Sequence, residues 1–220
     1  MTTGLNLSGT VLLHIASDAG FTGKLAFVDT GFHFPETLRF WKDLEAKYSS
    51  ISFVRLRPRI DTGPLFGTDP IKCCQLNKIA PLDEYLARIK PSALINARTR
   101  ESAKGRLGLQ FFEDGSPARI NPLVNFTRLD LEEFAKANNL TIHPLYASGF
   151  LSMGCWPCTK AVRPGEDQRA GRFSGQGRTE CGLWGTLGPP ETRTAGKMHP
   201  LPTASTGAPG VHDNREGIHS

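Results

Sequence analysis

The chain has 220 residues, of which 39% are hydrophobic and 21% charged, and a formal net charge of +5. This length and composition suit one soluble domain with a sizeable core. No run approaches the roughly 18 apolar residues of a membrane span, and residues 1–9 are polar and glycine-rich, unlike a signal peptide. We therefore expect a cytoplasmic protein with no membrane partner, whose cysteines stay reduced.

The predicted elements alternate between helices and strands along the chain. A buried helix is expected to start near residues 11–16, followed by a strand over 24–29, a helix over 35–48 and a strand over 51–56. A helix over 81–89 and a strand over 92–97 come next, and segments 107–113 and 118–120 resemble a small hairpin. Thr127 and Asp130 have the spacing of a capping box and open a helix to about residue 138.

This order predicts an α/β fold with a doubly wound, mostly parallel sheet and helices on both faces. Such a sheet normally begins with a strand, but here the first helix follows almost at once, so we expect the first strand to be missing or truncated. Half of residues 185–220 are Gly, Pro, Ser or Thr. We therefore expect a folded domain over 1–184 and a disordered tail over 185–220, because the tail has too little apolar surface to offset its ordering entropy.

The five cysteines fall into three places, Cys73-Cys74, Cys155-x-x-Cys158 and Cys181. The two pairs could supply four thiolate ligands to one metal or iron–sulfur site. The second pair alone also fits a redox dithiol or half of a zinc site. Adjacent cysteine side chains diverge, which favours a cluster of several irons over a single zinc ion. Zinc, redox and purely structural roles remain open from the residues alone.

Cys181 belongs to neither pair, so it is a candidate nucleophile. A nucleophilic thiol needs a lowered pKa, which nearby arginine or lysine provides. Arg169, Arg172 and Arg178 stand close to it in the sequence and favour an anion pocket, since guanidinium groups match phosphate and sulfate oxygens. The plain alternatives are a solvated basic surface and a buried structural cysteine. No long Lys/Arg run exists, so the net charge predicts no nucleic-acid partner.

Several motifs occur together and in order. They are Asp29-Thr-Gly-Phe-His-Phe-Pro-Glu-Thr37, Cys73-Cys74 followed by Lys78 and Pro81-Leu82, Ile120-Asn-Pro-Leu123, Gly154-Cys-Trp-Pro-Cys-Thr159, Pro164-Gly-Glu-Asp-Gln-Arg-Ala-Gly-Arg172 and Glu180-Cys-Gly-Leu183. With these motifs, about residues 3–184 resemble the assimilatory adenylyl-sulfate (APS) reductases of the sulfonucleotide reductase family. The resemblance implies a fold of the adenine nucleotide alpha hydrolase-like type.

The resemblance also implies a reaction and a set of site residues. Cys181 would attack the sulfur of APS, release AMP and form an S-sulfocysteine, which thioredoxin or a similar dithiol would reduce to free sulfite. A [4Fe–4S] cluster would be held by Cys73, Cys74, Cys155 and Cys158. The implied substrate-binding residues are Lys78, Arg169, Arg172, Asp29, Thr30, Gly31, and Ser8 and Gly9 of the phosphate loop. Assembly into a homo-oligomer is possible.

The chain departs from the family pattern in three places. Trp184 follows Leu183 where the family has histidine, Asn77 stands where arginine is usual, and the phosphate loop lacks the fuller serine-rich pattern. We expect weaker turnover from the first departure and the loss of one anion contact from the second. The alternatives are a reductase of 3′-phosphoadenylyl sulfate (PAPS) and a non-catalytic metal-binding module for nucleic acid. An ATP-dependent RNA thiolase would need a Ser-Gly-Gly-x-Asp-Ser loop, which is absent.

Overall fold

The computed structural model describes residues 1–178 and 180–183. The strands are β1 (Thr2–Thr3), β2 (Lys24–Val28), β3 (Ser52–Leu56), β4 (Ala93–Ile95), β5 (Phe112–Glu113) and β6 (Ala118–Ile120). The α-helices are α1 (Leu7–Asp18), α2 (Pro35–Lys47), α3 (Pro70–Cys74), α4 (Ala80–Ile89) and α5 (Arg128–Ala137). The predictions for residue 184 and for the tail over 185–220 lie outside the described residues.

The strands form two three-stranded sheets that meet at one bridge. In the first sheet β1, β2 and β3 are all parallel, and in the second β4 is parallel to β6 while β5 is antiparallel to it. A parallel bridge between Thr2 and Asn96 connects β1 to the end of β4. The strand order is therefore 3-2-1-4-6-5, in which the chain runs outward from β1 in both directions, as in doubly wound folds.

The first strand, expected to be missing or truncated, is present as the two-residue β1. Thr2 and Thr3 pair in parallel with Ala26 and Phe27 of β2. This strand was hard to predict because two polar residues carry no periodic signal. The expected hairpin is confirmed as well, since β5 pairs with β6 across the turn at 114–117.

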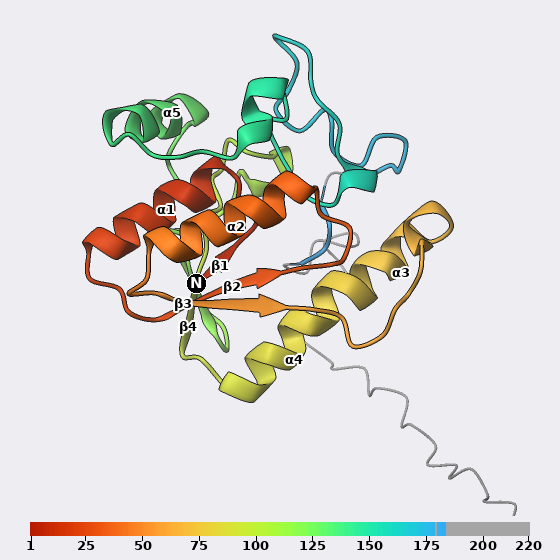
Figure 1. Cartoon of the computed structure of the whole chain (residues 1–220), viewed down its shortest axis with the longest axis horizontal. Helices are drawn as coiled ribbons and strands as arrows, with labels where there is room; N and C mark the ends of the chain where they lie inside the picture. The colour runs from red at the N-terminus through yellow and green to blue at the C-terminus, as the bar shows by residue number, and fades with distance from the viewer. Residues whose placement is uncertain (179, 184–220) are drawn as a thin grey trace, which may run out of the picture. The chain divides into compact units, whose positions relative to one another are not determined.

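Helices cover both faces of the first sheet, which explains why β2 is apolar and buried from Leu25 to Val28. Leu25 and Phe27 belong to a large core cluster with residues of α1 and α2, whereas Ala26 and Val28 pack with Leu82 of α4 on the opposite face. Alternate side chains of a strand point to opposite faces, so a strand covered on both sides has no polar position. Figure 1 shows α1 and α2 together on one side of β2 and β3, and α4 on the other.

The helix predicted over 81–89 begins earlier than expected. Helix α3, a π-helical turn η2 (Gln75–Ile79) and α4 follow one another without a break, and Figure 1 shows them as one rod. Pro81 lacks an N–H group and cannot complete the regular ladder, which accounts for the irregular turn before it. The rod carries Cys73 and Cys74 at the end of α3 and Lys78 in the π-helical turn.

The first turns of α5 and α2 confirm two further predictions. The capping box that opens α5 is confirmed, because Thr127 accepts a hydrogen bond from the backbone of Asp130 and Asp130 accepts one from the backbone of Thr127. Pro35 occupies the first turn of α2, as predicted. Among the described residues, no helix is long and apolar enough to cross a bilayer.

Candidate active site

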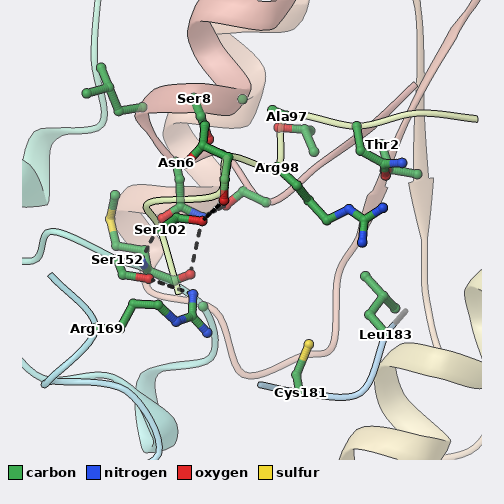
Figure 2. Close-up of a pocket in the computed structure, with 18 of the residues that line it drawn as sticks. Thr2, Asn6, Ser8, Ala97, Arg98, Ser102, Ser152, Arg169, Cys181 and Leu183 are labelled. Carbon is green, nitrogen blue, oxygen red and sulfur yellow. Dashed lines mark hydrogen bonds between the residues drawn. The ribbon is translucent and has the colours of Figure 1, made fainter. Parts of the chain in front are cut away.

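The main cavity, of about 210 Å³, lies where the strand order reverses. Its walls include residues of β1, the loop and first turn of α1, the end of β2 and the residues that follow β4. Ligands of doubly wound sheets bind at this position, at the carboxyl ends of the strands. Figure 2 shows side chains of β1, of the start of α1, of the residues after β4 and of the 152–183 region facing a common space.

Of the nine catalytic and substrate-binding residues that the sequence predicted, six line this cavity and three do not. Those that line it are Ser8, Gly9, Lys78, Arg169, Arg172 and Cys181. Asp29, Thr30 and Gly31 are not part of its wall. The buried Asp29 instead accepts hydrogen bonds from Arg55 at 2.8 Å and Arg57 at 3.1 Å. Burial opposes the charge of Asp29, but the backbone N–H of Gly31 and the guanidinium of Arg55 hold its pKa below the usual value.

Cys181 is half-buried, and Figure 2 shows its sulfur turned toward the cavity. Burial alone would raise the pKa of this thiol. The ammonium of Lys78, the backbone N–H of Leu183 and the guanidinium of Arg172 outweigh that effect and lower the pKa below its ordinary value. A thiol in this setting has more thiolate at neutral pH and is a better nucleophile.

Arg172 is fixed in place by the loop before the second cysteine pair. It is 9% exposed and donates to the carbonyl oxygen of Met153 at 2.7 Å and to Ser152 Oγ at 3.4 Å. A Cβ atom at Gly154 would lie 2.5 Å from the Nη2 atom of Arg172. The absence of a side chain at residue 154 is therefore what allows this guanidinium to occupy its position.

Arg169 and Arg106 face each other across a carboxylate in the cavity wall. Glu180 lies 2.9 Å from Arg106 Nη2 and 3.2 Å from Arg169 Nη2. Burial lowers the pKa of Arg169 to about 10 despite the neighbouring carboxylate. Arg106, Arg169 and Lys78 all line the main cavity. Three cationic side chains in one cavity can neutralise a ligand with more than one negative charge.

The four paired cysteines line a second, small cavity. Cys73, Cys74, Cys155 and Cys158 meet there although the pairs are about 80 residues apart in the sequence, and all five cysteines of the chain are free thiols. Lys78 lines this cavity as well as the main one. Burial opposes the charge of Lys78, but the thiolates of Cys155 and Cys181 raise its pKa above the ordinary value.

Each of the four thiols has a hydrogen-bond partner. Asn77 donates to Cys73 Sγ at 3.5 Å, Arg178 to Cys74 Sγ at 3.5 Å and Gln176 to Cys158 Sγ at 3.6 Å, and Thr30 Oγ1 lies 3.1 Å from Cys155 Sγ. The nitrogen atoms of Asn77, Gln176 and Arg178 in these contacts can only donate, so the sulfur atoms accept. Burial raises the pKa of Cys73 and Cys74 as free thiols. Within residues 1–178 and 180–183, no three His, Cys, Asp or Glu side chains are grouped closely enough to hold a single metal ion.

The amino-acid sequence is similar to a known protein family and to named relatives. Residues 1–161 match the family model of the phosphoadenosine phosphosulfate reductase domain. The chain belongs to this family. An adenosine 5′-phosphosulfate reductase of Deinococcus radiodurans is 49% identical over 84% of this chain and 75% of the relative. An enzyme of the same name from Mesorhizobium japonicum is 39% identical over 79% of this chain and 70% of the relative.

Solved structures support the fold. A PAPS reductase of Candida auris, in a phosphate complex, has a TM-score of 0.64 at 22% identity and covers 71% of this chain and 80% of its own. Candida glabrata FMN adenylyltransferase with FAD and pyrophosphate has a TM-score of 0.55 at 17% identity, covering 72% and 55%. At these identities the likeness concerns the fold alone, and it agrees with the adenine nucleotide alpha hydrolase-like fold that the sequence predicted.

Three features of this sulfonucleotide reductase domain were not predicted from its sequence. Asn77 was expected to mark a lost anion contact, but it is buried and serves the thiol of Cys73. Thr30, predicted as a substrate-binding residue, lies outside the wall of the main cavity, with its Oγ1 atom 3.1 Å from Cys155 Sγ. Glu180 was noted only as part of a motif, and its two ion pairs depend on arginines 11 and 74 residues away in the sequence. No local pattern could have indicated those partners.

His33 is a further polar residue of the main cavity. Its Nε2 atom lies 3.0 Å from the carbonyl oxygen of Val28, so that nitrogen carries the proton. Burial, and next the charge of Lys78, lower the pKa of His33 to about 4. The ring is therefore neutral at pH 7 and adds no positive charge to the cavity of this family member.

Proposed function

We propose that the chain is an APS reductase in which Cys181 is the nucleophile. The observation that carries this proposal is the half-buried thiol of Cys181 beside Lys78 and Arg172 in a cavity at the carboxyl ends of the strands. The names of the relatives support the choice of APS as substrate. Five free thiols suit a reducing compartment, and we place the enzyme in the cytoplasm.

The proposed reaction has two steps. The Cys181 thiolate attacks the sulfur of APS, the bond between that sulfur and the oxygen bridging to phosphate breaks, and AMP leaves with the electron pair. In the second step a thiolate of an external dithiol attacks Cys181 Sγ, sulfite leaves, and the second thiol of the donor restores the free Cys181. Thioredoxin or a protein of the same kind would be this donor.

The cationic side chains explain how a thiolate can approach an anion. APS carries a sulfate and a phosphate group, so an unassisted thiolate would be repelled. Lys78 and Arg172 lower the pKa of Cys181, and with Arg169 they would also balance the charge that develops on the departing AMP. Ser8 and Gly9 at the first turn of α1 lie where backbone N–H groups of a helix terminus favour a phosphate.

We propose that Cys73, Cys74, Cys155 and Cys158 hold a [4Fe–4S] cluster. The residues fit such a group, because four thiols line one cavity and donors from four different side chains are available to their sulfur atoms. When bound, the cluster would supply the negative charge that Lys78 balances, and it would join the α3–η2 rod to the 155–158 loop.

A single-turnover experiment tests the proposed function. The purified enzyme, given excess APS and no reductant, should release one AMP per chain and then stop, since each Cys181 can be used once. The Cys181→Ser variant should release none while retaining the same iron content and visible absorbance. Continuous AMP release without a reductant, or an equal burst from the serine variant, would exclude Cys181 as the nucleophile.

A further inference from the structure

Glu180, the residue before Cys181, binds two arginines of the main cavity, Arg106 and Arg169. Its carboxylate contacts Arg106 Nη2 at 2.9 Å and Arg169 Nη2 at 3.2 Å, and the three side chains are only 13–19% exposed. All three line the main cavity together with Cys181. These buried contacts hold residues 180–183 against the cavity wall.

The two arginines do not depend on Glu180 for their position. Arg106 also donates to Ser102 Oγ at 2.8 Å, and Arg169 also donates to Ser152 Oγ at 3.3 Å. Both guanidinium groups therefore have a second anchor in the cavity wall. If the carboxylate moved away, these contacts would still hold both guanidinium groups in the cavity wall, where an anionic ligand can contact them.

The position of Glu180 is unfavourable for the thiol next to it. Its negative charge opposes the cationic groups that lower the pKa of Cys181. It also places an anion in a cavity whose other charged groups, including Lys78 and Arg172, suit an anionic ligand. A carboxylate at this place disfavours both the Cys181 thiolate and the binding of an anionic substrate, unless the substrate displaces it.

We propose that Glu180 is an internal substitute for the anionic groups of the substrate. In the free enzyme it occupies Arg106 and Arg169 and keeps the Cys181 segment at the cavity, and incoming APS displaces the carboxylate and takes over both arginines. This inference rests on the proposed function, because it assumes that APS binds in this cavity.

The test compares two carboxylates of the same cavity. Glu180→Gln removes the charge that competes for the arginines but keeps the size of the side chain. Glu101→Gln is the matched control, since Glu101 also lines the cavity but accepts from the backbone N–H of Arg128 rather than from either arginine. Both variants lose one negative charge, so any difference between them reports on the arginines. The probe is AMP, titrated by calorimetry into the iron-loaded proteins, with adenosine as the uncharged control.

The proposal predicts that Glu180→Gln binds AMP about tenfold more tightly than wild type, and adenosine equally well. It also predicts a lower KM for APS, because the substrate no longer has to displace a carboxylate from the two arginines. Glu101→Gln should change AMP affinity by no more than about twofold. Unchanged or weaker AMP binding by Glu180→Gln, or equal tightening in both variants, would overturn the proposal.

A second variant covers the case in which Glu180→Gln does not fold. Glu180→Asp keeps the charge but shortens the side chain, so its hold on the arginines weakens, and AMP should bind several-fold more tightly than to wild type. Weaker or unchanged binding would count against the proposal. Failure of the proposed function has a separate signature, because wild type would then release no burst of AMP from APS.

Discussion

Asn77 donates its side-chain amide to Cys73 Sγ at 3.5 Å, one helical turn along the same rod. The same amide donates to Thr62 Oγ1 at 2.7 Å, and Asn77 is 2% exposed. A buried amide in this position stabilises a thiolate, because the partially positive hydrogen of its N–H group points at the negatively charged sulfur.

This contact predicts that Asn77→Ala weakens the retention of the proposed cluster. The thiolate of Cys73 would lose its donor, so we expect less iron per chain and faster loss of visible absorbance in air than in wild type. Thr62→Val removes the other partner of the amide and leaves the sulfur contact intact. If both variants keep or lose iron equally, the contact with Cys73 has no role of its own.

Lys78 is predicted to control the reactivity of Cys181. Lys78→Met keeps the length of the side chain but removes the largest cationic contribution to the lowered pKa of that thiol. The pKa of Cys181 should rise, which is measured as a shift of the pH dependence of alkylation to higher pH, with Cys181 identified by peptide mapping. Lys72→Met is the control, because Lys72 is exposed and lines neither cavity. An unshifted profile for Lys78→Met would contradict the assignment.

Gly154→Ala is predicted to impair the site more than the fold. The added Cβ would lie 2.5 Å from Arg172 Nη2, so the guanidinium must move. We expect kcat/KM for APS to fall about tenfold or more, while overpacking costs about 1–3 kcal/mol of unfolding free energy. Gly108→Ala is the matched control, since a Cβ there meets nothing within 4 Å. Full activity in Gly154→Ala would show that the position of Arg172 is not critical.

The buried His143 is predicted to make the folded protein less stable in mild acid. It is 1% exposed, its Nε2 atom is 2.9 Å from Thr37 Oγ1, and burial lowers its pKa to about 4. The unfolded chain, with an ordinary pKa near 6.5, binds the proton first, so stability falls as the pH drops below about 6.5. Between pH 7 and 5.5 this residue should account for about 1 kcal/mol of the loss in urea unfolding. The His143→Gln variant should show a correspondingly smaller pH dependence, and an unaltered one would refute this explanation.

Local signals were sufficient for much of the fold. The capping box of α5 depends on residues three apart, and the apolar run of β2 reflects helices on both its faces. The rod over residues 70–89 was predicted only in part, because Pro81 is typical of a helix start and here follows a π-helical turn. The two polar residues of β1 gave no strand signal and pair with β2 only in the folded sheet.

In the candidate site, too, local sequence signals predicted some features, and contacts between distant residues could not be predicted. Cysteine spacing indicated one group of four thiols and a separate Cys181, and the structure gathers the four around one cavity while Cys181 lines another. The donors to the thiols could not be predicted, because Thr30 and Cys155 are 125 residues apart and Arg178 and Cys74 are 104 apart. Such contacts follow from the topology of the sheet and have no pattern in the sequence.

The measurement that tests the account most directly is to locate the sulfur of APS on the enzyme. Wild-type protein is incubated with APS labelled at its sulfur, without any dithiol, then digested and mapped by mass spectrometry. The account predicts one sulfonate on the peptide that contains Cys181, released as sulfite when thioredoxin is added. Label on any of the other four cysteines, or an unlabelled Cys181 in folded, iron-loaded enzyme, would contradict it.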